Sequence, residues 1–400
     1  MDYLEQRRKL RQMVQERLDY GRDYTDEEVE DTIDEVLMEQ ENLELCSVEL
    51  RRRLRKELFD SLRRLDILQI FVDDSSVTEI MINGLDHIFV ERDGQLQELD
   101  RAFDSMEKLQ DVIQQIVAGC NRVVNEASPI VDARLSNGAR VNIVMSPIAL
   151  NGPIITIRRF PDKPITMQKL IAMETISPEA ADFLKTLVKA GYNIFVSGGT
   201  GSGKTTFLNV LSGFIPPEQR IITIEDSAEL QLQGIPNLVR LETRNGNAEG
   251  CREIGIRELI RSSLRMRPDR IIVGEVRGAE AIDMLQCMNT GHDGSMSTGH
   301  ANSAADMLSR LENMDLPLPA IRNQIASGVD IIVHLGRIRD KSRKVLEITE
   351  VVGCENGEIR LNPLYCFEEL GESSEGNVVG KLQKKGGLLH EGKLKAAGLS

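Results

Sequence analysis

One glycine-rich loop constrains this chain more than any other feature of its sequence. Residues 198–205 read GGTGSGKT; they follow an apolar run at 194–196 and open a helical pattern that continues to 212. The pattern GxxxxGK[ST] between a strand and a helix is a phosphate-binding loop, in which backbone N–H groups and the positive end of the helix face a phosphate. The loop therefore predicts a nucleotide-binding domain.

We expect the residues of this loop to bind ATP and Mg²⁺. Lys204 is expected to reach the β- and γ-phosphates, and the hydroxyl of Thr205 is expected to ligate Mg²⁺. A chance glycine-rich turn is a poor alternative, because a strand precedes the loop and a helix follows it. The predicted nucleotide-binding residues are Gly198, Gly199, Thr200, Gly201, Ser202, Gly203, Lys204, Thr205 and Thr206.

Hydrolysis also needs carboxylates near the phosphates, and two predicted strands end in them. One strand is followed by Glu225, Asp226 and Glu229, and the other by Glu275. Carboxyl ends of parallel strands meet at one edge of a sheet, where bound phosphates also lie. Asp226 alone is equally consistent with a helix cap or a surface charge, but two such strand ends in one domain favour a catalytic or metal-holding role.

Two histidines and a group of arginines are further candidates. His292 and His300 flank a short predicted strand; a lone histidine is usually structural, but His300 at the carboxyl end is placed to sense a γ-phosphate. An arginine from another domain or subunit often completes a triphosphate site, because its fork of donors neutralises developing charge. Any single arginine is more consistent with a surface ion pair. As a group, the best candidates are Arg134, Arg140 and Arg158.

Residues 1–66 predict a helical arm. They are dense in Glu, Arg, Leu and Gln, and they contain one glycine and no proline. Thr25 and Glu28 form a capping box ahead of apolar residues at helical spacing. A basic run at 51–56 could contact anionic lipid or nucleic acid, but a solvated face balanced by neighbouring acidic residues is the simpler interpretation.

Two domains and a tail are predicted after the arm. Short strands between Asn-Gly and Asp-Gly turns, with one helix among them, are typical of a small α+β domain. The later alternation of strands and helices favours a mostly parallel sheet covered by helices on both faces. The predicted segments are the helical arm at 1–66, the α+β domain at 67–160, a linker at 161–168 with its hinge at Pro161 to Pro164, the α/β nucleotide-binding domain at 169–368 and a flexible tail at 369–400.

Composition excludes several classes of protein. A net charge of −14 disfavours a chain that coats nucleic acid, so we expect no direct nucleic-acid contact. The cysteines form no CxxC pair, which disfavours a disulfide framework and a cysteine zinc site. No run approaches 18 uninterrupted apolar residues, and the first residues are highly charged; we therefore expect a cytoplasmic chain without a signal peptide or a membrane span.

Four motifs in their order resemble the secretion ATPase superfamily, which powers type II and type IV secretion and type IV pilus machines. The resemblance covers about residues 65–367 and looks closest to the CpaF branch, the ATPases of tight-adherence (Flp) pilus systems. The motifs are SGGTGSGKTT at 197–206, ITIEDSAEL at 222–230, LIRSSLRMRPDRIIVGEVRGAEA at 259–281 and TGHDGSMSTGHANSAADMLSRL at 290–311.

The resemblance implies a RecA-like P-loop ATPase domain and a role for each motif. Residues 198–205 match the Walker A loop, and residues 292–300 match the His box. The remaining implied roles are Glu229 in the Asp box as the catalytic carboxylate that polarises water, Glu275 in the Walker B motif as the residue that holds Mg²⁺ through water, and Arg134, Arg140 and Arg158 or Arg159 as arginines that reach the nucleotide from the N-terminal domain.

The resemblance also implies an assembly and a task. Members form hexameric rings, with nucleotide held between the two domains of one subunit and touched by the neighbouring subunit. We therefore expect a homo-hexameric cytoplasmic ATPase, peripheral at the inner face of the membrane, that works on an integral-membrane platform protein to power pilus assembly or protein secretion. Two alternatives remain: a conjugation-type (type IV) secretion ATPase, and a slow ATP-binding assembly regulator.

Overall fold

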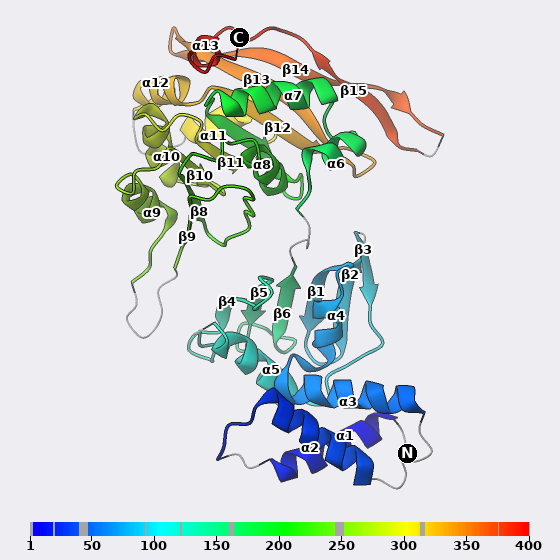
Figure 1. Ribbon diagram of the computed structural model, residues 1–400. Helices are drawn as coiled ribbons and strands as arrows, with labels where there is room; N and C mark the ends of the chain where they lie inside the picture. The colour runs from blue at the N-terminus through cyan, green and yellow to red at the C-terminus, as the bar shows by residue number, and fades with distance from the viewer. Residues whose placement is uncertain are drawn as a thin grey trace. The chain divides into compact units, whose positions relative to one another are not determined.

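The computed structural model describes residues 3–18, 21–39, 47–92, 94–120, 122–159, 164–244, 252–312, 317–374 and 376–399. It divides into two compact units, Met1–Asp162 and Lys163–Ser400, which are taken in turn (Figure 1). Most of the predicted hinge, 161–163, lies outside the described residues.

The first unit begins with a helical arm of α1 (Tyr3–Arg17), α2 (Asp26–Glu39) and α3 (Val48–Arg63). The predicted capping box is confirmed: Thr25 N donates to Glu28 Oε2 at 2.8 Å, and Glu28 N donates to Thr25 Oγ1 at 3.2 Å. The apolar stripe of α2 is buried against the other two helices. Within the basic run, Arg53 pairs with Glu57, and Arg55 pairs with carboxylates of α2, as a solvated face requires.

The rest of the first unit is an antiparallel sheet with helices packed on it. The sheet order is β3-β2-β1-β6-β5-β4, and buried residues of α5 pack on its apolar face. The elements are the short helix η2 (Asp66–Leu68), α4 (Gln69–Asp73), β1 (Val77–Asn83), β2 (His87–Arg92), β3 (Gln95–Glu98), α5 (Met106–Ala118), β4 (Ile130–Arg134), β5 (Arg140–Val144) and β6 (Ile154–Arg158).

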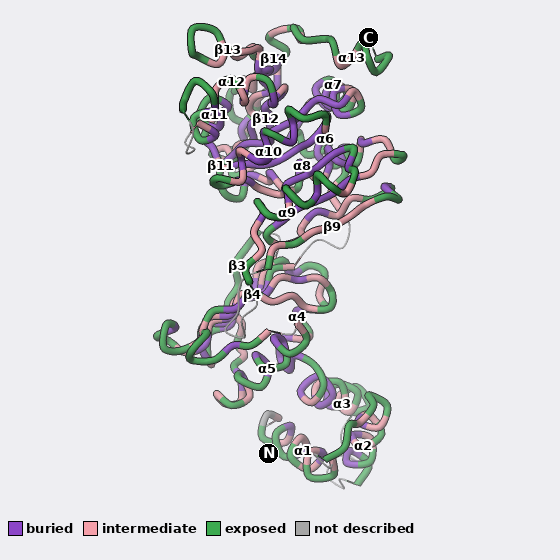
Figure 2. Tube along the Cα trace, turned by 90° about the vertical axis from the view of Figure 1, so that its left-hand side faces the viewer, coloured by how far each residue is buried: buried purple, intermediate pink, exposed green. Residues whose placement is uncertain are grey.

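The second unit is a nine-stranded sheet of order β15-β14-β13-β12-β7-β11-β10-β8-β9. Its central strands run parallel, and three of them, β7, β8 and β10, are buried along their whole length. Figure 2 shows buried residues, in purple, through the middle of this unit. The strands are β7 (Ile194–Gly198), β8 (Ile221–Glu225), β9 (Leu238–Glu242), β10 (Arg270–Val273), β11 (Met296–His300), β12 (Ile331–Arg337), β13 (Arg343–Glu355), β14 (Glu358–Glu372) and β15 (Val378–Lys384).

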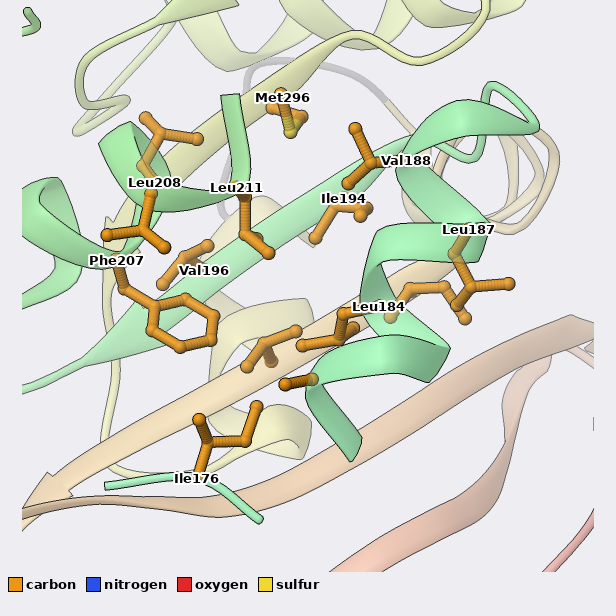
Figure 3. Close-up of a cluster of buried hydrophobic side chains, with 14 of the residues drawn as sticks. Ile176, Leu184, Leu187, Val188, Ile194, Val196, Phe207, Leu208, Leu211 and Met296 are labelled. Carbon is orange, nitrogen blue, oxygen red and sulfur yellow. The ribbon is translucent and has the colours of Figure 1, made fainter. Parts of the chain in front are cut away.

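Helices cover both faces of this sheet, so the predicted α/β class is confirmed. One core joins α7 and α8 to β7; Figure 3 shows Leu184 and Leu187 of α7 beside Phe207 and Leu211 of α8. A second core fills the other face. The helices are α6 (Met167–Ala172), α7 (Pro178–Lys189), α8 (Lys204–Ser212), α9 (Ile256–Ser263), α10 (Glu280–Asn289), α11 (Ala304–Glu312), α12 (Leu318–Gly328) and α13 (Gly392–Ala396).

The structure differs from the predicted segments in three places. The expected flexible tail at 369–400 instead holds the end of β14, all of β15 and α13, because apolar residues such as Val378 and Leu382 of β15 pack against the sheet. The end of the expected linker at 161–168 already belongs to α6. Strand β9 was missed, because its alternating residues are only half-buried at a sheet edge.

Across the described residues, none of the helices combines the length and the apolar character that crossing a membrane requires.

Candidate nucleotide site

The phosphate-binding loop turns sharply between β7 and α8. A Cβ on Gly198 would lie 2.4 Å from the carbonyl oxygen of Leu335 and 2.5 Å from Ser202 Oγ, so only glycine fits where β7 ends. Gly203 has φ +92°, a conformation that L side chains rarely adopt, directly before α8 begins. Lys204 Nζ and Ser202 Oγ both donate to the carbonyl oxygen of Gly199, at 3.0 and 2.9 Å. The loop is therefore already folded around its lysine.

Strand pairing brings the predicted His box to this loop. β11 runs parallel to β7 with His300 opposite Gly198. His300 Nδ1 lies 3.3 Å from Lys204 Nζ, and His300 Nε2 lies 2.9 Å from Glu275 Oε1. The structure thus brings together Lys204, His300 and Glu275, which the sequence separates by many residues.

Arg277 connects the two acidic segments at this edge. Its Nε and Nη2 donate to Glu275 Oε2 at 2.9 and 2.7 Å, and its Nη1 lies 3.9 Å from Asp226 Oδ2. No pattern along the chain distinguishes Arg277 from the many other arginines; only its position two residues after Glu275 could have drawn attention to it. Asp226 is exposed, and Glu229 and Glu275 are half-buried, so carboxylates from both acidic segments are accessible here.

Burial shapes the charges of the site. It lowers the pKa of Lys204, and it lowers the pKa of His300, with the Lys204 charge acting in the same direction. Glu225, only 3 % exposed, has its pKa raised to about 7 by burial. Burial thus disfavours the charged forms of Lys204, His300 and Glu225, a pattern that is common among the titratable groups of functional sites.

A groove of about 640 Å³ opens beside the loop. His300 lines it together with residues of the phosphate-binding loop, residues that follow β11 and residues of α11. The lining residues are Gly199, Thr200, His300, Ala301, Asn302, Asp306, Ser309 and Arg310. The groove therefore lies next to the phosphate-binding loop, on the side of His300 and α11.

His292 lies at the other end of β11, away from the phosphate-binding loop. Its Nδ1 is 3.3 Å from the carbonyl oxygen of Cys287, at the end of α10. From these contacts we interpret His292 as a structural histidine and His300 as a candidate functional one.

The three predicted arginines lie in one row on the sheet of the first unit. Register places Arg134 opposite Arg140, and Arg140 opposite Arg158. Residues directly opposite in antiparallel strands share a face, so the row gathers three guanidinium groups on one side of the sheet. Arg158 also lies 4.0 Å from Glu79. Because the row belongs to the first unit, its contact with nucleotide stays a prediction.

Arg159 has a different role from its neighbour. Its Nη1 donates to the carbonyl oxygens of Asp74 and Val77, which ties β6 to the start of β1. Of the pair Arg158 and Arg159, only Arg158 belongs to the arginine row.

The donor set suits magnesium held with a nucleotide. Thr205 supplies a hydroxyl at the start of α8 and Glu275 a carboxylate, both hard oxygen donors of the kind Mg²⁺ prefers. No group of three or more His, Cys, Asp and Glu able to hold a metal occurs in the part of the chain that the structure describes. The phosphates of the nucleotide would have to complete such a site.

Comparison with known proteins places the chain by sequence and by fold. The family model described as "Type II/IV secretion system protein" matches residues 62–366. A putative conjugal transfer protein of Mycobacterium tuberculosis is 34% identical over 292 residues, which are 70% of this chain and 83% of the relative. The conjugal transfer protein TrbB of Rhizobium radiobacter is 32% identical over 322 residues, 79% of this chain and 96% of the relative.

A solved structure shares the fold. The pilus retraction motor PilT with bound ADP superposes with a TM-score of 0.54 at 19% sequence identity, covering 84% of this chain and 88% of that one.

Proposed function

Because the chain belongs to the type II/IV secretion system protein family, we propose that it hydrolyses ATP to drive a secretion or pilus machine in the membrane. The observation that carries the proposal is the meeting of Lys204, His300 and Glu275 at the end of the phosphate-binding loop, with Asp226 joined to them through Arg277. The predicted family membership is confirmed; the more specific likeness to the CpaF branch belongs to this proposal.

Each residue has a proposed task in turnover. Backbone N–H groups of 198–205 and Lys204 hold the β- and γ-phosphates, and Glu229 orients the attacking water and accepts its proton. Thr205 and Glu275 would hold Mg²⁺, which supplies positive charge against the phosphates when it is bound. His300, between Lys204 and Glu275, senses whether the γ-phosphate is present.

The arginine row of Arg134, Arg140 and Arg158 would supply further positive charge to the triphosphate in turnover. Their opposing positions in adjacent strands gather three guanidinium groups on one face, and such groups bind phosphate oxygens through charge-assisted hydrogen bonds. Closure of the first unit on the nucleotide would then depend on the γ-phosphate and convert hydrolysis into motion.

The assembly and location follow as parts of the same proposal. We expect a homo-hexamer at the inner face of the cytoplasmic membrane, acting on an integral-membrane platform protein without contacting nucleic acid. The net charge of −14 supports the last point.

A conjugation-type (type IV) secretion ATPase is the second candidate. The names of the relatives in M. tuberculosis and R. radiobacter, both conjugal transfer proteins, favour it over the tight-adherence assignment. Both candidates share the ATPase site and differ in the machine that is driven. A slow assembly regulator differs from both, because its turnover would not support work.

The test is the ATP hydrolysis rate per subunit as a function of protein concentration, with Mg²⁺ and without DNA or lipid. A rate that climbs steeply as larger species form in sedimentation supports a ring motor. A flat rate over the same range favours the regulator. Glu229→Gln should bind ATP normally and lose turnover; normal hydrolysis by this variant would remove Glu229 from the catalytic role.

A further inference from the structure

The segment that carries Glu229 has no helix or strand of its own. After β8 ends at Glu225, residues 226–237 run as an irregular chain to β9. A catalytic carboxylate must nevertheless be held in one place, because small displacements from the reacting atoms are costly. The position of Glu229 must therefore come from side chains that grip this segment.

Glu225 holds two consecutive backbone amides of the segment. Its Oε2 accepts hydrogen bonds from Glu229 N at 2.8 Å and from Leu230 N at 2.9 Å. The carboxyl group reaches them by passing Gly274, where a Cβ would lie only 3.0 Å from Glu225 Cγ. Its other oxygen, Oε1, is buried without a hydrogen-bond partner among the described residues, so Oε2 alone ties Glu225 to this segment.

Asn209 holds the next amide in line. Its Oδ1 accepts a hydrogen bond from Gln231 N at 2.9 Å. Asn209 belongs to α8, the helix whose first residue is Lys204, so the phosphate-binding helix itself grips the acidic segment. From the other side, Arg240 of β9 donates to the carbonyl oxygen of Leu230 at 3.0 Å.

We propose that Glu225 and Asn209 are positioning residues that fix Glu229 by accepting the amides of three successive residues, 229 to 231. Glu225 ties the segment to β8, and Asn209 ties it to the helix that binds the phosphates. A movement of α8 when the loop takes up a triphosphate is thereby passed to the carboxylate that acts on water. The proposal rests on the proposed function, in which Glu229 is that carboxylate.

The chain offers a matched control at the opposite edge of the same sheet. Glu350 is also a buried carboxylate, 1 % exposed, and it also accepts two consecutive backbone amides, those of Leu389 and His390. It holds the C-terminal segment and lies where the parallel strands begin, because it pairs with Ile331, which lies opposite Ile194 at the start of β7. A purely structural role for Glu225 would make the two carboxylates equivalent.

The experiment compares Glu225→Leu, Glu225→Gln, Asn209→Ala and Glu350→Leu in the full-length chain. Steady-state hydrolysis of Mg-ATP gives kcat and KM, and binding of ADP gives affinity. We expect Glu225→Leu and Asn209→Ala to lower kcat by about 10- to 100-fold with little change in KM or ADP affinity. Glu225→Gln keeps an acceptor oxygen and should retain more of kcat than Glu225→Leu. Glu350→Leu should keep kcat and lose only thermal stability.

A second readout does not depend on activity. Hydrogen exchange at the amides of 229–231 in the nucleotide-free protein should rise in Glu225→Leu and Asn209→Ala, and stay at the wild-type level in Glu350→Leu. If Glu225→Leu lowers kcat no more than Glu350→Leu, or if exchange is unchanged, the positioning role is overturned. If wild-type protein shows no turnover, the proposed function fails, while the exchange measurement still decides whether these side chains hold the segment. Should Glu225→Leu not fold, Glu225→Gln and Asn209→Ala carry the test.

Discussion

Buried charges have different surroundings at the two ends of the parallel strands in the nine-stranded sheet. We call these ends the amino edge and the carboxyl edge. At the amino edge, where β10 begins, the guanidinium of Arg270 is 2 % exposed and is bonded on two sides, to the carbonyl oxygen of Val188 and to Gln219 Oε1, both at 2.6 Å. Glu350 at this edge likewise accepts backbone amides and the side chain of Asn362. The charged groups of Arg270 and Glu350 therefore have hydrogen-bond partners within the protein.

At the carboxyl edge the buried charges keep unused capacity. Among the residues that the structure describes, Glu225 Oε1 is buried with no hydrogen-bond partner, and Lys204 Nζ contacts the carbonyl oxygen of Gly199 and Nδ1 of His300 but no carboxylate. An uncompensated buried group costs stability, so we interpret these groups as candidates for a role beyond stability. The comparison thus separates structural charges from candidate functional ones, which sequence alone does not do.

Lys204→Ala, at the carboxyl edge, should have the largest effect of the variants, a loss of ATP hydrolysis. The loss of one preorganised donor to the phosphates is expected to lower kcat for ATP hydrolysis by about 100- to 1,000-fold. The midpoint of thermal unfolding should stay unchanged or rise, because burial disfavours the charged lysine. Steady-state kinetics and a thermal melt measure both, with Lys185→Ala on the exposed side of α7 as control. A large loss of stability with hydrolysis intact would reverse the comparison.

Arg270→Met, at the amino edge, should have the opposite outcome: stability should fall and turnover should not change. The carbonyl oxygen of Val188 and Gln219 Oε1 would lose their charged donor inside the protein, which should lower the free energy of unfolding by about 3 kcal/mol. Turnover per folded subunit should not change. Denaturant unfolding and active-site-normalised kinetics check the two parts; a fall in kcat without a fall in stability would show that this edge also serves catalysis.

Glu225→Gln should change how the free energy of unfolding depends on pH. Burial raises the pKa of Glu225 to about 7, so between its ordinary range and that value the folded state keeps a proton that the unfolded chain has released. The wild-type protein therefore loses stability as pH rises through this window, and the variant does not. The free energy of unfolding of the variant, relative to wild type, should increase by about 2 kcal/mol between pH 5 and pH 8. Parallel unfolding curves at both pH values would contradict the burial argument.

Arg140→Gln should have the smallest effect on stability and tests the first unit. Arg140 is only half-buried, at the surface of the first unit, so its replacement should change the free energy of unfolding by no more than about 0.5 kcal/mol. Turnover should fall more than ATP affinity if the row meets the transition state. Arg159→Gln is the matched control: it removes donors to two backbone carbonyls and should lower stability instead. Equal turnover in Arg140→Gln and wild type would remove the row from the site.

Local sequence determined the phosphate-binding loop, the buried parallel strands, the capping box and the family. These features depend on residues close together in the chain: the glycines of 198–203 permit a turn that other residues would not, and apolar runs such as 271–273 specify strands buried on both faces. The roles of Glu229, Glu275 and the arginines stay predictions, because they concern a ligand and a reaction.

Only the tertiary structure decided which of the many charges meet. Parallel register sets His300 beside Gly198, antiparallel register aligns Arg134 with Arg140, and Arg277 and Asn209 were not distinguished by any pattern along the chain. Hydrogen bonding between strands and burial act between residues far apart in sequence, and no local spacing encodes them. The same reason explains why β9 and β15 were missed as strands: each is stabilised by the neighbour it pairs with.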